Sequence, residues 1–354
     1  MNAFNLKRFN FDKLSDAIIF MKKNEWFKKF LKSCSMGLGM IPGVSAGTMA
    51  VLVGIYDELI DAIASLRKNF KASFRTLLPI LLGLVLSSAL ILVAVQYGYG
   101  YAPFIITCVF AGFILGSLPL VTKELKNEKT SAKGLSLILI GLIVAAGIGV
   151  LSYCSVRYWN FNLNSYFVAG TYWWVYIVVL VAGFISAIAC VIPGISGAMI
   201  LYIFGLYTPI ISIVISQKDT AGNIVVSSMF QDHTRLASGF GYLFCLLIGI
   251  LFGLAVVAKA MKKLLETKRV PTFQVVLGFI LGSVISMFIN QNIFNTETQK
   301  TIYETTPLWG YIVGPILFVL VLVGFYFISR KMGAKQEEAP SQTTETADEK
   351  NEIK

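Results

Sequence analysis

Long uncharged apolar runs are the feature that most constrains how this chain can fold. Runs of about twenty residues recur between Leu77 and Ser329, and a helix needs about that length to cross roughly 30 Å of hydrocarbon. Hydrophobic residues make up 56% of the chain and charged residues 14%, with a mean hydropathy of +0.72. This composition excludes a soluble enzyme and predicts an all-α polytopic membrane protein.

The distribution of basic residues predicts the topology. Of the 30 Lys and Arg residues, 26 lie in five segments that fall on one side of the membrane when the apolar runs are threaded in order. The positive-inside rule then places both termini in the cytoplasm. The net charge of +11 is therefore interpreted as a topology signal, and no nucleic-acid partner is expected because no stacking aromatics are interleaved with the basic clusters. The predicted spans lie near residues 77–95, 102–121, 134–153, 239–258, 272–289 and 308–329.

The polar regions outside the membrane repeats are interpreted separately. Residues 1–32 are basic and amphipathic, which is typical of a cytoplasmic segment that lies on membrane lipids, and they lack the pattern of a cleaved signal peptide. Residues 154–172 are expected to form an outer loop. Residues 331–354 are rich in acids and poor in apolar side chains, which predicts a disordered cytoplasmic tail.

Two further apolar segments do not fit a simple series of spans. Both flanks of residues 33–65 are basic, so this segment must leave and return on the cytoplasmic side, but it is too short for two full spans. We therefore expect a re-entrant helical hairpin. Residues 173–216 begin and end outside, and their length permits either two full spans or a hairpin that enters from the opposite face.

These two segments belong to an internal repeat. The sequence Ile-Pro-Gly-Val-Ser at 41–45 returns as Ile-Pro-Gly-Ile-Ser at 192–196, an offset of 151, and Gly-Phe-Ile-Leu-Gly-Ser at 112–117 returns unchanged at 278–283, an offset of 166. An odd number of crossings separates the two halves. The sequence therefore predicts two inverted-topology repeats at 33–153 and 173–330, each a broken or re-entrant hairpin plus three transmembrane helices. This arrangement is typical of alternating-access transporters, although a duplicated channel or scaffold would share it.

The repeated Pro-Gly pairs predict a binding site. Proline followed by glycine interrupts a helix, and the free N–H groups of the helix that begins after the break favour an anion. Two such helix starts facing each other would hold a phosphate or carboxylate near the midplane; the alternative is that Pro-Gly merely kinks two packed helices. Ser45, Thr48 and Ser196 are suitable helix caps. The predicted site consists of Pro42, Gly43, Ser45, Gly47, Thr48, Pro193, Gly194, Ser196 and Gly197.

Charged residues near the breaks have two interpretations. Arg67, Arg75 and Arg157 are candidates for meeting an anion at the mouths of the site. Asp57, Glu58 and Asp61 lie within the first hairpin, where ionisable groups are costly and usually functional, so they are candidates for proton or sodium coupling. The alternative places these carboxylates in the cytoplasmic interface, paired with Arg67 and Lys68.

An enzymatic function has little support in the sequence. Residues 43–47 match Gly-x-Ser-x-Gly, but that motif requires a strand-to-helix turn and a general base, and the only histidine, His233, is distant in sequence. No metal and no cofactor are expected. The spaced glycine pairs are expected to pack helices closely. These pairs are Gly112 with Gly116, Gly249 with Gly253, and Gly278 with Gly282.

The paired Ile-Pro-Gly-(Val/Ile)-Ser segments and the repeated Gly-Phe-Ile-Leu-Gly-Ser element resemble the bacterial polyprenyl-phosphate transporter (PopT) family, over residues 33–330. The resemblance implies a multi-pass protein of the bacterial cytoplasmic (inner) membrane. Such a protein would return undecaprenyl phosphate from the outer to the inner leaflet for envelope glycan synthesis, by ion-coupled alternating access. Without the resemblance, the residues support only a transporter with an anion-compatible site. An ion-coupled carrier of a small soluble anion is therefore an alternative interpretation. A lipid-modifying enzyme and a scaffold are weaker alternatives, and the sequence is compatible with a homo-oligomer.

Overall fold

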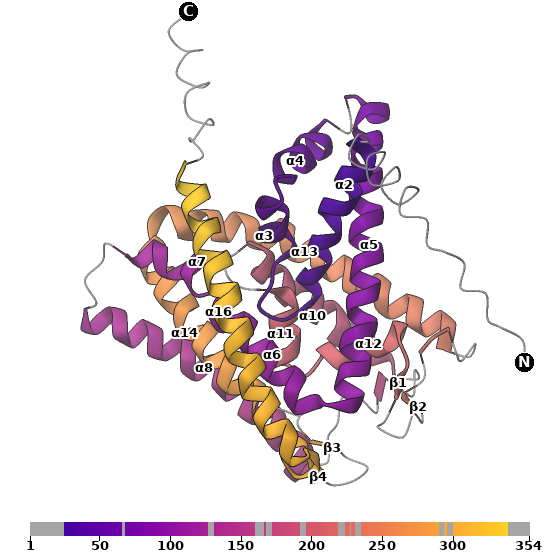
Figure 1. Cartoon of the computed structure of the whole chain (residues 1–354), viewed down its shortest axis with the longest axis vertical. Helices are drawn as coiled ribbons and strands as arrows, with labels where there is room; N and C mark the ends of the chain where they lie inside the picture. Colours follow the sequence, from indigo (N-terminus) through magenta and orange to yellow (C-terminus); the bar gives the residue numbers. More distant parts are fainter. Residues whose placement is uncertain are drawn as a thin grey trace, which may run out of the picture.

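A computed structural model shows a helical protein whose longest helices form one bundle (Figure 1). Expectations for residues 1–24 and 339–354, and for most of the outer loop, lie outside the residues that the structure describes. The described residues are 25–65, 68–126, 131–159, 166–167, 172–191, 196–218, 224–226, 228–230, 235–289, 294–295 and 300–338.

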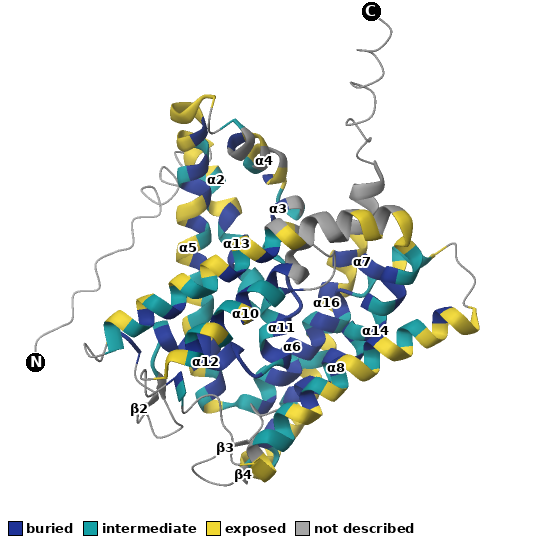
Figure 2. Cartoon of the chain, turned by 180° about the vertical axis from the view of Figure 1, so that it is seen from behind, coloured by how far each residue is buried: buried dark blue, intermediate teal, exposed yellow. Residues whose placement is uncertain are grey.

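Six helices are long and apolar enough to cross a membrane, which confirms the polytopic membrane fold. Their outward faces carry Leu, Ile, Val and Phe, and Figure 2 shows such exposed positions along α5 and α8. Exposed apolar surface of this extent is suited to lipid rather than water. The six are α5 (Phe70–Tyr101), α6 (Pro103–Gly116) with α7 (Pro119–Thr122) and η2 (Lys123–Leu125), α8 (Ala132–Trp159), α13 (Leu236–Thr267), α14 (Arg269–Met287) and α16 (Leu308–Glu338).

The two remaining apolar segments are each divided into several helices. The first contains α2 (Glu25–Cys34), η1 (Ser35–Met40), α3 (Ala46–Leu52) and α4 (Tyr56–Ala64). The second contains α10 (Trp173–Val191), α11 (Gly197–Ile203) and α12 (Tyr207–Val214), with an angle of 111° between α11 and α12. We call these the first hairpin (25–64) and the second hairpin (173–214).

The bounds of the helices follow the offsets of the sequence motifs. Helices α3 and α11 begin and end 151 positions apart, and α5 and α13 begin and end 166 positions apart. Gly54 and Gly205 occupy the same place after α3 and α11, and both have positive φ, 67° and 69°. Each therefore supplies the left-handed residue that ends a helix and turns the chain into the next one.

Several helices extend beyond the expected boundaries. Helix α2 begins at Glu25 rather than near residue 33, because its amphipathic sequence continues the hairpin into the polar interface. Helix α8 continues to Trp159, past the expected start of the outer loop, and α16 continues to Glu338, into the segment expected to be disordered. A helix keeps its own backbone hydrogen bonds, so it can project from the hydrocarbon without a new partner.

Two short antiparallel ribbons, which the sequence interpretation missed, connect helices at their ends. Strand β1 (Gln217–Lys218) pairs with β2 (Ile224–Val226), and β3 (Phe294–Asn295) pairs with β4 (Lys300–Thr301). The one-turn helix α15 (Ile302–Thr305) follows β4 and leads into α16.

The repeated glycines pack helices of one half against helices of the other. A Cβ atom at Gly112 in α6 would lie 2.8 Å from the Phe318 carbonyl oxygen in α16, and one at Gly278 in α14 would collide with the Ile138 carbonyl oxygen in α8. The last helix of each half therefore packs on the equivalent middle helix of the other half. The expected close packing is confirmed for Gly112, Gly116, Gly278 and Gly282, and for Gly249 and Gly253 against α10.

The equivalent helices α6 and α14 run in opposite directions. At one end, Arg269 Nε donates a hydrogen bond of 2.8 Å to Glu124 Oε2, joining the start of α14 to the segment after α6. At the other end, the rings of Phe104 and Phe288 lie 6.5 Å apart, joining the start of α6 to the end of α14. Between them lies the largest buried cluster, which brings α5 and α6 together with α11, α12 and α14.

Candidate functional site

The first predicted helix break is a tight turn at Pro42 and Gly43. The Val44 N–H donates to the Ile41 carbonyl oxygen at 3.1 Å, and Gly43 has φ 93°, so the four residues have the features of a type II turn. A Cβ atom on Gly43 would lie 2.6 Å from the Ile114 backbone nitrogen. Glycine is thus required both by the turn and by its contact with α6, and the predicted break is confirmed.

A new helix begins directly after this turn. Ser45 is half-buried, and its carbonyl oxygen accepts a hydrogen bond of 3.0 Å from Met49 N–H as α3 begins. Gly47, in the first turn of α3, is exposed. The side chain of Thr48 is outside the described atoms.

The second break is described only from Ser196 onward, so Pro193 and Gly194 lie outside the described residues. Helix α11 begins at Gly197, with Ser196 at the N-cap position in an extended conformation. The expected capping role of Ser196 is wrong, because its side chain makes no hydrogen bond to the helix N–H groups. Among the residues that the structure describes, its Oγ is instead buried without a hydrogen-bond partner, which typically costs about 1–3 kcal/mol. Gly197 packs near Ser186, whose carbonyl oxygen would lie 3.4 Å from an added Cβ.

The two hairpins meet through a tyrosine. Tyr207, the first residue of α12, donates from its hydroxyl to the Met40 carbonyl oxygen at 2.8 Å, at the end of η1. Within the described residues, Ser45 and Ser196 share no hydrogen bond with each other. The structure therefore joins the two break regions, but through Tyr207 rather than through the predicted serines.

A buried polar cluster that the sequence interpretation missed lies beside this junction. Tyr99 in α5 donates to the hydroxyl of Tyr202 in α11, and Thr107 Oγ1 in α6 lies 3.3 Å from the same hydroxyl. Gln96 Nε2 donates to Ser212 Oγ in α12 at 3.3 Å. The sequence carries one signal for this cluster, because Gln96 and Thr107 are polar residues within apolar runs.

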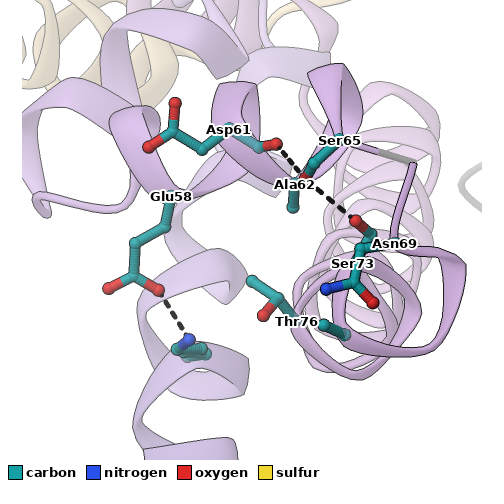
Figure 3. Close-up of a pocket in the computed structure, with 9 residues that line it drawn as sticks. Glu58, Asp61, Ala62, Ser65, Asn69, Ser73 and Thr76 are labelled. Carbon is teal, nitrogen blue, oxygen red and sulfur yellow. Dashed lines mark hydrogen bonds and ion pairs between the residues drawn. The ribbon is translucent and has the colours of Figure 1, made fainter. Parts of the chain in front are cut away.

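The acidic residues of α4 line an open pocket of about 320 Å³ between α2, α4 and the start of α5 (Figure 3). Glu58 forms an ion pair of 2.7 Å with Lys29, and both Glu58 and Asp61 are exposed. This pairing favours the interfacial interpretation for Glu58, with a partner, Lys29, that the sequence interpretation did not name. The side chain of Asp57 is outside the described atoms. The other lining residues are Ala62, Ser65, Asn69, Ala72, Ser73 and Thr76.

The candidate entry residues lie near helix ends. Arg75 is exposed near the start of α5, and Arg157 is exposed in the last turn of α8. Arg67 lies outside the described residues.

At the start of α2, the hydrogen bond from Lys28 and its charge lower the pKa of Glu25, so that exposed carboxyl stays ionised.

Comparison with known proteins assigns the chain to a family. A family model described as undecaprenyl phosphate translocase-like matches residues 36–305, most of the chain. The chain belongs to this family.

Two curated relatives of this translocase-like chain are named polyprenyl-phosphate transporter. The one from Vibrio cholerae is 31% identical over 208 residues, which cover 54% of this chain and 62% of that protein. The one from Staphylococcus aureus is 27% identical over 272 residues, which cover 76% of this chain and 88% of that protein. No solved structure matches the chain. The names of the family and of both relatives describe transporters rather than enzymes.

Proposed function

We propose that this protein transports undecaprenyl phosphate across the bacterial cytoplasmic membrane, from the outer to the inner leaflet, so that the lipid carrier can be reused in envelope glycan synthesis. The observation that carries the proposal is the family match, which includes both helix breaks. The curated relatives support polyprenyl phosphate as the transported lipid through their names.

The proposed architecture is a pair of inverted repeats, each a re-entrant hairpin and three spans. It is supported by the equal offsets of the helix bounds and by the opposite directions of α6 and α14. With both termini in the cytoplasm, the α5–α6 turn at Ala102 lies outside and the Arg269–Glu124 pair lies inside. We propose that the part of residues 1–32 that precedes α2 rests on the inner surface, while α2 packs against α5.

The proposed head-group site lies between the two breaks. The backbone N–H groups at the starts of α3 and α11 offer partial positive charge, and Ser196 offers a buried hydroxyl that has no protein partner among the described residues. Ser45 occupies the equivalent place at the start of α3. The long prenyl tail can stay among lipids against the exposed apolar helices. Pro42, Gly43, Gly47, Thr48, Pro193, Gly194 and Gly197 complete the proposed site.

The proposed mechanism is alternating access, in which one repeat rocks against the other and exposes the site to each face in turn. We propose that an ion gradient drives this motion. Asp61 is the stronger coupling candidate, because Glu58 is already paired with Lys29 and no described residue forms an ion pair with Asp61. Asp57 is a second coupling candidate because it lies one turn before Asp61 on α4.

Transbilayer movement of undecaprenyl phosphate in proteoliposomes tests the proposal. Native protein should move the lipid faster than empty liposomes, and the Ser45→Leu/Ser196→Leu double variant should lose this activity because leucine fills the space of the head group. Ser136→Leu is the matched control, because Ser136 is an exposed serine on α8. Imposing a proton or sodium gradient should change the native rate, and Asp61→Asn should reduce that response.

The outcomes separate the alternatives. Failure of folded native protein to move the lipid would refute the proposed substrate, and uptake of inorganic phosphate in the same vesicles would instead indicate a carrier of soluble anions. Full lipid transport by the double variant would reject the proposed site while leaving the substrate in place.

A further inference from the structure

A cluster of buried hydroxyl groups joins the two halves near the end of the bundle that contains Ala102. Tyr99 lies in the last turn of α5 and Thr107 in the second turn of α6, on either side of the turn at Ala102. Both come from the first half, and both approach Tyr202 of the second half. All three side chains are buried, and Tyr202 has no exposed surface.

Aromatic rings surround this hydroxyl cluster and exclude water from it. The ring of Phe110 lies 6.0 Å from the rings of Tyr99, Tyr202 and Tyr207, with edge-on contacts to the last two. The hydrogen bonds therefore lie in an apolar setting, where a separated hydroxyl without a new partner would be costly. The arrangement in which the hydroxyls are hydrogen-bonded to one another is therefore favoured over one in which they are separated and no water replaces the lost bonds.

The opposite end of the first half is built differently. There, α2, α4 and α5 enclose the open pocket that contains the Lys29–Glu58 ion pair. The described structure thus has a sealed polar junction near Ala102 and an open polar pocket at the far end of α5. On the proposed topology, the sealed end is the outer one.

We propose that Tyr99, Thr107 and Tyr202 form an outer gate, and that the structure is the state in which this gate is shut. The proposal rests on the transport function proposed above, because a head group arriving from the outer leaflet must pass between the two halves to reach the breaks. Opening separates Tyr99 and Thr107 from Tyr202, and water or the entering phosphate replaces the lost hydrogen bonds. Gln96 of α5 and Ser212 of α12 form a second polar link between the two halves.

Sided cysteine labelling tests the gate independently of transport. Val95 lies one turn before Tyr99 on α5 and is buried, so Val95→Cys in a chain whose five native cysteines are replaced reports opening. A membrane-impermeant thiol reagent added outside should label it slowly. Tyr202→Phe or Tyr99→Phe should raise the rate about fivefold, the factor that corresponds to losing about 1 kcal/mol of closed-state stability. The double variant should add little, because both substitutions remove the Tyr99–Tyr202 hydrogen bond and each single variant leaves only one contact with Thr107, of 3.3 Å or 3.5 Å.

Tyr242→Phe is the matched control. Tyr242 is also a buried tyrosine, but no described residue hydrogen-bonds its hydroxyl, so its removal should leave labelling of Val95→Cys unchanged. A second reporter, Ala62→Cys in the inner pocket, should not label faster from the inside in the gate variants. Unchanged labelling in folded Tyr99→Phe and Tyr202→Phe would overturn the gate, as would equal increases at both faces, which indicate general loosening. Either result leaves the transport assay to judge the proposed function separately.

Discussion

The two hairpins share a backbone plan but differ in their surroundings. Helices α3 and α11 have seven residues each, and each is followed by a left-handed glycine and then by a tyrosine that begins α4 or α12. Yet α4 places exposed carboxylates beside an open pocket, whereas α12 is buried along almost its whole length. The two hairpins therefore share the backbone that follows each break. Their side chains differ, because α4 and its pocket form a polar mouth whereas α12 forms a packed wall.

The wall of the second hairpin is buried and uncharged at the positions equivalent to Glu58 and Asp61 of the pocket. Asp61 and Ala62 correspond to Ser212 and Ile213 at the offset of 151, and Ile213 packs in a buried cluster with Tyr242 and Met229. Since the sequences differ, this asymmetry is built into the chain and does not reflect one conformation alone. The first hairpin is suited to contact with water and ions, and the second to a dry contact with its neighbours.

The largest effect is expected where the first hairpin contacts α6. Gly43→Ala combines a strained positive φ with a collision against the Ile114 backbone, so we expect a loss of about 3 kcal/mol or more in unfolding free energy. The yield of monodisperse protein and its thermal unfolding midpoint measure this. Gly54→Ala is the matched control, with positive φ but no atom within 4 Å of its added Cβ, and should cost only about 1–2 kcal/mol. Equal losses in the two variants would show that the contact with α6 contributes nothing.

A smaller loss of unfolding free energy should distinguish Tyr207 from Tyr56, the tyrosine at the equivalent position of the first hairpin. Tyr207→Phe removes the hydrogen bond to the Met40 carbonyl oxygen and should lower the unfolding free energy by about 1 kcal/mol. Tyr56→Phe, at the equivalent position in the exposed hairpin, should change it by less than about 0.5 kcal/mol. Denaturant or thermal unfolding followed by tryptophan fluorescence compares them directly. A similar loss of unfolding free energy at both positions would contradict the difference between the exposed first hairpin and the buried second hairpin.

The smallest effect is expected at the Lys29–Glu58 ion pair beside the open pocket of the first hairpin. Glu58→Gln breaks the contact with Lys29, but Glu58 is half exposed, and such pairs contribute about 0–1 kcal/mol. We therefore expect nearly native stability and a transport rate within about twofold of native, since water screens both groups. Lys29→Gln should behave alike. A large loss of transport in Glu58→Gln with stability intact would instead return Glu58 to the coupling machinery.

The sequence was sufficient to predict features that depend on local pattern. The six spans follow from run length and charge, and the turn follows from Pro42, which fixes φ, and Gly43, which permits a positive φ. Contacts between distant segments were missed, including Tyr207 with Met40 and Tyr99 with Tyr202. A tyrosine in an apolar run gives no indication of which distant helix it will face.

An error and an omission at the site have the same physical origin. Ser196 has the residue type and position of an N-cap, but its rotamer leaves the hydroxyl buried away from the helix N–H groups, which only coordinates can show. For Glu58 the sequence left ion coupling and pairing with Arg67 or Lys68 open, and neither interpretation named Lys29 of α2, which the fold brings beside it. Side-chain orientation and tertiary proximity, rather than residue type, decide both cases.

The central claim is that two different hairpins make one head-group site, and a binding titration tests it most directly. A short-chain polyprenyl phosphate would be titrated calorimetrically into detergent-solubilised native protein, Ser45→Leu, Ser196→Leu and the control Ser136→Leu. We expect one site per chain, native affinity in the control, and at least about tenfold weaker binding in each single hairpin variant, a loss of about 1.4 kcal/mol. Two independent sites, or native affinity in either hairpin variant, would contradict the claim.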